Sequence, residues 1–287
     1  MTEPERPHRV LVPVEILRGE AVPETLVEVL SSVPVVLLGY HEVPEQTAPG
    51  QARMQFEEKA QRELDELVGA FEDAGGTVAT RLVFTHDSMK TFERIAAELE
   101  CDAVVLLNPA PRLERVLLPL RGDLIATPIT RLVGAILAGN DAQVTLFHVS
   151  ATEDEQSEAR ALLDDATAML EAEGIAADRI NRSTVVADTP LETIVEVADD
   201  HDFIIMGESQ PSIRDRVFGN PSTTVAAQTV NPVLVVRRRF LEMDADERED
   251  RVDDLEETAD EFDDSRTGAV DANNNSNNDD GDDADRH

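Results

Sequence analysis

The sequence has no tryptophan, one tyrosine and one cysteine among its 287 residues. A single cysteine, Cys101, excludes an internal disulfide and any zinc site built from several cysteines. Long hydrophobic runs are also missing: residues 104–107 form one of the longest, far below the ~18 residues of a membrane span. The N-terminus has no apolar stretch of the signal-peptide type. We therefore expect a cytoplasmic protein without membrane insertion.

Lysine is nearly absent, and acidic residues dominate the charge. Lys59 and Lys90 are the only lysines, and 60 Asp and Glu face 25 Lys and Arg, for a formal net charge of −35. Such a surface repels phosphates, which argues against a nucleic-acid partner. At molar salt the Debye length falls to about 3 Å, so dense carboxylates stop repelling one another. Acid excess, scarce lysine and few aromatics predict a protein adapted to high salt; an ordinary acidic protein with a disordered tail is the alternative.

Residues 241–287 differ in composition from the rest of the chain. They hold 20 acids and 4 arginines, a net charge of −16, and few apolar residues. A segment with nothing to bury is predicted to be a disordered acidic tail. The other 240 residues keep 35 − 16 = 19 negative charges, so the acidity also belongs to the part expected to fold.

The same pattern occurs twice before this tail. Residues 9–14 read Arg-Val-Leu-Val-Pro-Val, and residues 115–120 read Arg-Val-Leu-Leu-Pro-Leu. Each run predicts a short apolar strand. After it the sequence predicts a second strand, an acidic helix, a third strand, another helix and a fourth strand. The acidic helices end at Gly75 and Gly174, the usual C-terminal stop. The expected segments are second strands at 33–40 and 142–149, helices at 51–74 and 153–173, third strands at 77–84 and 180–187, and helices capped at Asp87 and at Asp188-Thr189.

This duplication predicts an α/β fold with two tandem, open, mostly parallel sheets, each covered by helices on both faces. We expect a truncated first domain at 1–112, a complete second domain at 113–240, and a split near residues 111–114. The second copy alone continues through a loop to Gly219, a helix near 222–229 and a fifth strand at 233–236. Ligands of such sheets bind at the carboxyl ends of the strands.

The end of the second copy resembles the universal stress protein family. The resemblance rests on Met206-Gly207 after a buried strand, the loop and helix that follow, and the last strand Val-Asn-Pro-Val-Leu-Val-Val at 230–236. It covers residues 113–238 well and 8–108 more loosely. The resemblance implies a Rossmann-like sheet of the adenine nucleotide alpha hydrolase type and a role in stress response.

Some members of this family bind ATP through glycine, two residues, glycine, nine residues, and glycine followed by Ser or Thr. Here Gly207 is followed by Gln210 in place of the second glycine, and Gly219 comes one residue early and precedes Asn220. These departures predict weak or absent nucleotide binding and no required cofactor, with ATP or AMP as the alternative. If a nucleotide binds, the site would comprise Arg121, Met206, Gly207, Gly219, Asn220, Ser222 and Thr223.

An aspartate after the first strand is common among the family's nucleotide binders. The first copy has Glu15 there, and the second has Arg121, which could pair with a bound anion or with a surface acid. Other polar constellations are interpreted as structural. The residues His86-Asp87-Ser88 form a helix cap rather than a catalytic triad, His41 and His148 are solvated strand-end histidines, and Cys101 is a buried thiol.

The sequence therefore predicts a non-catalytic stress-response or regulatory protein that acts through protein contacts. The alternative is an AMP or ATP sensor that uses the second copy; an enzyme has the least support, because no nucleophile and base stand out. The partner is an unidentified protein. The similarity of such domains to cytoplasmic appendages of transporters leaves a membrane transporter open.

The last strand, Val233–Val236, predicts assembly. Its four β-forming residues are too apolar to leave in water, and it should lie at the edge of the second sheet. Resemblance to the family implies that it pairs antiparallel with its copy in a homodimer. Alternatively, it covers the open edge of the first sheet and leaves a monomer. The three arginines at 237–239 would repel one another across a two-fold axis.

Overall fold

The structure is a computed structural model that describes residues 7–107, 112–121, 127–137, 139–207 and 221–237, without the side chains of 127–129 and 221–224. The first half contains β1 (Val10–Glu15), η1 (Ile16–Arg18), α1 (Glu24–Leu30), β2 (Val35–Glu42), α2 (Pro49–Asp73), β3 (Val78–Thr85), α3 (Ser88–Glu98) and β4 (Ala103–Leu106). The second half contains β5 (Arg115–Pro119), α4 (Thr127–Leu137), β6 (Gln143–Ser150), η3 (Glu153–Glu155), α5 (Gln156–Ala172), η4 (Ala177–Arg179), β7 (Ile180–Val186), α6 (Pro190–Ala198), β8 (Phe203–Gly207), α8 (Pro221–Gln228) and β9 (Val233–Val236).

The repeated order of strands and helices is confirmed, and local chemistry explains its boundaries. Asp87 caps α3, since its carboxylate accepts the main-chain N–H of Lys90. Gly75 and Gly174 follow the long helices with φ of +84° and +95°, a conformation that side chains with a Cβ disfavour. At the matching cap of α6, Thr189 makes no side-chain bond to the helix, and Pro190 occupies the first turn instead.

The nine strands form one sheet in the order β3-β2-β1-β4-β9-β8-β5-β6-β7. The expectation of two separate sheets is therefore wrong, although the strands of each half stay together and do not interleave. The halves join where β4 and β9 pair antiparallel, with Val104 opposite Val235. The other paired strands are parallel.

The prediction that Val233–Val236 forms an edge strand is also wrong. Strand β9 pairs with β8 on one side and with β4 on the other, so it lies inside the sheet. Arg237 extends the junction: its main-chain N–H donates to the carbonyl of Asp102 at 2.8 Å, and its guanidinium donates to the carbonyl of Cys101. The strand thus covers the open edge of the first half within the same chain.

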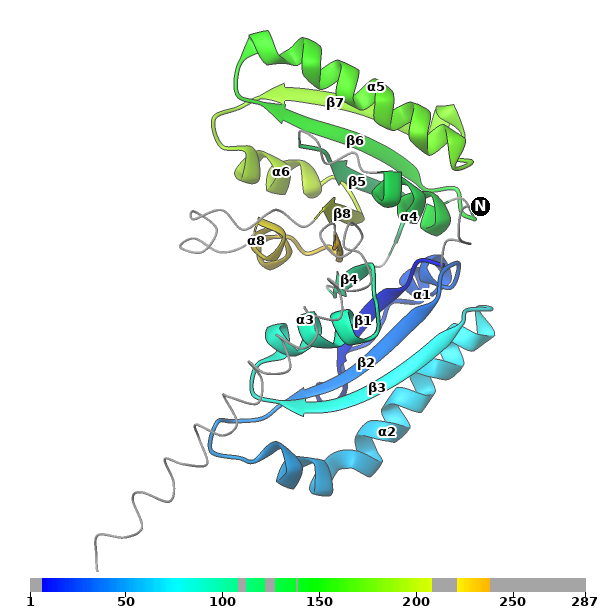
Figure 1. The fold of residues 1–287 in the computed structure, drawn as a ribbon, viewed down its shortest axis with the longest axis vertical. Coiled ribbons are helices and arrows are strands. Elements are labelled where there is room, and N and C mark those ends of the chain that lie inside the picture. The colour runs from blue at the N-terminus through cyan, green and yellow to red at the C-terminus, as the bar shows by residue number, and fades with distance from the viewer. Residues whose placement is uncertain (1–6, 108–111, 122–126, 138, 208–220, 238–287) are drawn as a thin grey trace, which may run out of the picture. The chain divides into compact units, whose positions relative to one another are not determined.

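Helices cover both faces of the sheet (Figure 1). On one face, helices α1, α2, α4 and α5 pack against a single hydrophobic core that has residues from both halves, such as Leu30 and Leu170. On the other face, α3 packs on the first half, while α6 and α8 pack on the second. Cys101 is fully buried under α3. None of the helices in the described ranges offers an apolar stretch that could cross a bilayer.

The chain divides into Met1–Met243, which is one compact unit, and Asp244–His287. The predicted disorder of residues 241–287 falls outside the described residues, as do Arg238 and Arg239.

Candidate functional site

The carboxyl ends of β5, β6, β7 and β8 lie at one edge of the sheet, because these neighbouring strands are parallel. Two of the predicted site residues meet this edge from adjacent strands. Arg121 is exposed and follows β5, and Gly207 is the last residue of β8, the strand beside it. This is the position at which open α/β sheets bind ligands.

The other predicted site residues divide into two groups. Met206 reaches the same strand end, but its side chain is only 7% exposed and packs in the core with Leu117 and Phe147, so only its main chain is available to a ligand. Ser222 and Thr223 belong to α8, but their side chains are outside the described residues, as are Gly219 and Asn220 entirely.

Ser150, which the sequence analysis did not select, is the most unusual polar residue of this edge. It ends β6, it is 1% exposed, and its Oγ is the one buried side-chain polar atom in the described part of the chain that has no hydrogen-bond partner. Buried hydroxyls are normally bonded, because an unsatisfied one costs about 1–3 kcal/mol. Ser150 therefore leaves one unsatisfied hydroxyl beneath the surface at the carboxyl ends of these strands, and a bound molecule could pair with it only where the side chains that cover it move.

The duplication could have identified Ser150. Strand register aligns Pro13 with Pro119, so His41 in the first half corresponds to Ser150 in the second. A polar residue at the same strand end in both copies is the relevant signal, and it follows from the alignment of residues 33–40 with 142–149.

In the first half, the corresponding position at the carboxyl ends of β1 and β2 is filled by the chain's own side chains, and we call it the closed edge. Glu15 ends β1, is 6% exposed, and accepts the Nδ1–H of His41 at 2.8 Å and the main-chain N–H of Glu42 at 3.3 Å. The main-chain N–H of Glu15 donates to the carboxylate of Glu20 at 2.6 Å. Because the carboxylate of Glu15 is buried beneath these partners, little of its surface is open to a ligand.

Two pKa values report the electrostatics of this closed edge. Burial raises the pKa of Glu20; the bond from the Glu15 N–H opposes this shift, and the negative charge of Glu15 adds to it. Burial also raises the pKa of Tyr40 to about 12, and the negative charges of Glu20, Glu15 and Glu42 contribute to that shift. The ring of Tyr40 packs edge-on against Phe92, with centroids 4.8 Å apart.

The histidines near the strand ends are structural. His148 donates through Nδ1 to the carbonyl of Leu120 at 2.8 Å, and His86 donates to the carbonyl of Val43 at 3.1 Å. His41 and His148 are half-exposed at their strand ends, and each also bonds to the protein, His41 to Glu15 and His148 to the carbonyl of Leu120. Across the described ranges, no cluster of three or more His, Cys, Asp or Glu side chains is arranged to hold a metal ion.

Comparisons with known proteins agree with this architecture. Residues 112–237 match the sequence model of the Universal stress protein family. A search of curated proteins found no match. The solved structure of a universal stress protein from Archaeoglobus fulgidus DSM 4304 superposes with a TM-score of 0.54 at 15% identity, over 80% of this chain and 96% of that chain. This likeness shows a shared fold.

Two further solved structures are similar. A putative universal stress protein from Pseudomonas aeruginosa UCBPP-PA14 has a TM-score of 0.46 at 14% identity, over 88% of this chain and 98% of that one. A universal stress protein solved in complex with cAMP has a TM-score of 0.38 at 23% identity, over 45% of this chain and 98% of that one. The bound cAMP is a property of that protein.

Proposed function

Since the chain belongs, through residues 112–237, to the universal stress protein family, we propose that it acts in stress response or regulation through protein contacts and not as an enzyme. The observation that carries this proposal is the closure of the first half. Glu15, the residue at the usual ligand-facing position, is buried and bonded to His41 and Glu42. The carboxyl end of β1 in the first half is then not available to a small ligand.

To test this proposal, the protein is incubated with saturating ATP and the released phosphate is measured. We expect no turnover above buffer, and sustained turnover would contradict a non-catalytic role.

A second candidate function is adenine-nucleotide sensing by the second half, and Ser150 favours it. Its buried, unpaired hydroxyl lies at the same strand-end edge as Gly207 and the exposed Arg121. A hydroxyl can donate to and accept from a base or a ribose, and a guanidinium can pair with a phosphate. The bound nucleotide would be the effector. Arg121 would pair with its phosphate, and Ser150 would hydrogen-bond to its base or ribose.

Calorimetric titration with ATP and with AMP in molar KCl, with mass analysis of the purified protein for bound ligand, tests this second function. We expect at most one nucleotide per chain, with a Kd well above about 1 μM, because Gln210 and Asn220 replace the small or hydroxyl residues of the family pattern. Ser150→Ala should weaken any binding about five-fold or more, whereas Ser183→Ala on the exposed part of β7 should not. Equal affinity in both variants would remove Ser150 from the site.

We also propose that the protein is adapted to high salt. Its net charge of −35 and the near absence of lysine support this proposal. Adaptation of this kind predicts a fold whose stability depends on screening.

A further inference from the structure

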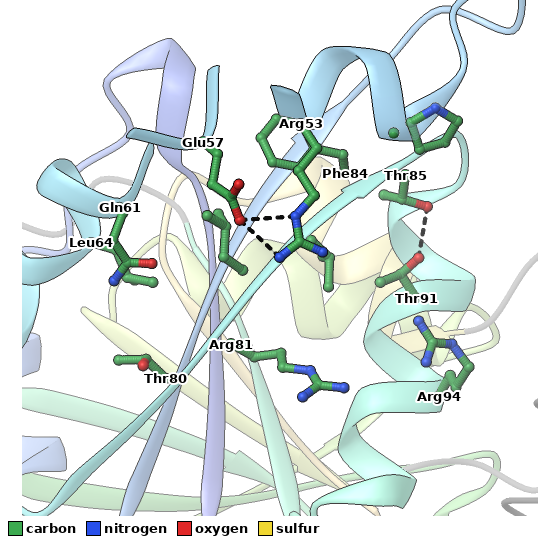
Figure 2. A pocket seen from close by; sticks show the side chains of 14 residues that line it. Arg53, Glu57, Gln61, Leu64, Thr80, Arg81, Phe84, Thr85, Thr91 and Arg94 are labelled. Carbon is green, nitrogen blue, oxygen red and sulfur yellow. Dashed lines mark hydrogen bonds and ion pairs between the residues drawn. The ribbon is translucent and has the colours of Figure 1, made fainter. Parts of the chain in front are cut away.

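The outer edge of β3 borders a groove with a volume of about 600 Å³. Helix α2 forms one wall, through residues such as Arg53 and Leu64, and α3 forms the other, through Thr91 and Arg94 (Figure 2). Strand β3 pairs with β2 on one side and ends the sheet on the other. The groove therefore has an open strand edge along its floor.

The register shows which main-chain groups face the groove. The carbonyl of Thr77 accepts from Val35 at the start of β2, and that of Thr85 accepts from Val43 just after its end. Successive residues of a strand alternate in direction. The N–H and C=O groups of Thr80, Leu82 and Phe84 consequently point away from β2 and along the open edge. A row of such groups can pair with an added strand.

The side chains of this edge also alternate between two faces. Leu82 and Phe84 lie on the α2 face, where Leu82 packs beside the buried Leu64. The α2 wall on this side also carries the polar side chains of Glu57 and Gln61. Arg81 and Arg94 line the α3 side of the groove (Figure 2). An added strand would meet the hydrocarbon of Leu82 and Phe84 on one face and guanidinium groups on the other.

Positive charge gathers here although the chain is strongly acidic. Glu98 forms an ion pair with Arg94, and its other oxygen is 3.9 Å from the guanidinium of Arg81, so one carboxylate serves two guanidinium groups. Arg53, 59% exposed, pairs with Glu57 at the α2 rim. Within the trio of Arg81, Arg94 and Glu98, two guanidinium groups share one carboxylate, so a further anionic side chain could pair with Arg81.

The duplication provides an internal comparison. Register aligns Arg81 with Ser183 in β7, and the matching cap bonds of Thr91 and Thr193 align Arg94 with Glu196 in α6. The equivalent edge of the second half thus has a hydroxyl and an acid where the first half has two arginines. The arginine pair belongs to the β3 edge specifically and not to the repeated fold.

We propose that the groove along β3 binds an extended peptide segment of a partner protein, which adds to β3 as a tenth strand and alternates acidic with aliphatic residues. The acidic side chains pair with Arg81 and Arg94, and the aliphatic ones cover Leu82 and Phe84. A second copy of β3 is disfavoured as the occupant, because two-fold pairing would bring the same arginines together. The groove would be the surface through which the proposed regulatory contacts are made. The peptide binding rests on the proposed function only for its biological role.

Fluorescence anisotropy with the full chain tests the proposal. The probe is a fluorescein-labelled octapeptide of alternating Val and Glu; the first control probe has Gln for Glu, and the second carries N-methyl groups on alternate amides. We expect the Val-Glu probe to bind and both controls to bind at least about ten-fold more weakly, because the first loses charge-assisted bonds and the second loses ladder bonds. Equal binding of either control would overturn the proposal.

Variants of the protein locate the site. Arg81→Gln and Arg94→Gln should each weaken binding about five-fold or more, whereas Arg182→Gln on the β7 edge should not. Melting curves of each variant verify folding. No binding by the unmodified chain, or unchanged binding by the β3 variants, would overturn the proposal while leaving the nucleotide titration unaffected. If the probe binds only after the acids in residues 241–287 are replaced by amides, the occupant of the groove is the chain's own acidic segment, and the proposal of a partner peptide is overturned.

Discussion

Asp102 and Asp202 perform the same structural task in the two halves. The carboxylate of Asp102 accepts the main-chain N–H of Arg9 at 3.0 Å, and that of Asp202 accepts the main-chain N–H of Arg115 at 2.9 Å. The N–H of each aspartate returns a bond of 2.8 Å to the carbonyl of the same arginine. Each aspartate therefore fixes the start of its central strand pair, β1 with β4 or β5 with β8.

The carboxylate of Asp102 should contribute more to the free energy of unfolding than the carboxylate of Asp202. Asp102 is 1% exposed and Asp202 is 20% exposed. Asp102→Ala removes a buried carboxylate that accepts from the half-buried N–H of Arg9 and from Nδ1 of His8, and it should cost about 1–3 kcal/mol of unfolding free energy. In Asp202→Ala water can replace the more exposed carboxylate at a smaller cost. Denaturant titration of both variants in the same salt measures the difference. A larger loss in the Asp202 variant would contradict this account.

Tyr40 is a spectroscopic probe of the closed edge, because it is the only tyrosine and tryptophan is absent. Its pKa is raised to about 12, so its phenol should stay protonated at pH 11, where an unfolded tyrosine is ionised. Absorbance of the phenolate against pH measures this midpoint. The sign follows from linkage: stability from the protonated phenol is lost as pH rises from about 10 through about 12. A midpoint near 10 in the folded protein would refute the expectation.

Glu20→Gln should stabilise the protein at neutral pH. Burial raises the pKa of Glu20, so the charged carboxylate is less favourable in the folded chain than in the unfolded one. The amide oxygen of glutamine can still accept the N–H of Glu15. The melting temperature at pH 7 should therefore increase in the variant, and the gain should vanish as pH falls below about 4.5, where the unfolded glutamate is protonated too. Glu66→Gln, at an exposed position of α2, is the matched control, and an equal gain there would point to net charge alone.

Low salt should destabilise the fold. Residues 1–240 retain 19 negative charges by the difference 35 − 16, and their repulsion is unscreened when the Debye length grows to about 30 Å at 0.01 M. Melting temperatures in 0.01 M and 2 M KCl, followed by circular dichroism, measure the effect. Equal values would remove the inference of high-salt adaptation.

The pairing of β4 with β9 predicts the response to proline. Because the N–H of Arg237 faces β4, alternation places the N–H of Val235 on the same side, toward Val104. Val235→Pro should remove this bond and cost at least about 1 kcal/mol, and Leu234→Pro, which acts on the β8 side, is its control. Light scattering at high salt should give the monomer mass of 31.5 kDa for the unmodified chain. A doubled mass that halves in Val235→Pro would show that β9 pairs with a second copy.

The sequence by itself determined the repeated order of elements, because its signals are local. Apolar runs such as Val10–Glu15 form buried strands, Asp87 caps a helix through its own side chain, and Gly75 takes the left-handed conformation that ends one. Family membership of the second half was likewise readable from its last strand and the glycine before it. Each of these features depends on neighbours within a few residues.

Tertiary structure alone decided where β9 lies and which polar groups were left unpaired. A strand forms the same ladder of main-chain hydrogen bonds with a neighbour from its own chain as with one from a second copy. The sequence of an apolar strand therefore does not determine which strand it pairs with. Within the chain, β4 is already held close to β9, and pairing there avoids the entropy lost when two molecules associate. The missing partner of Ser150 and the arginines along β3 likewise depend on segments far apart in sequence, which only the register of the sheet brings together.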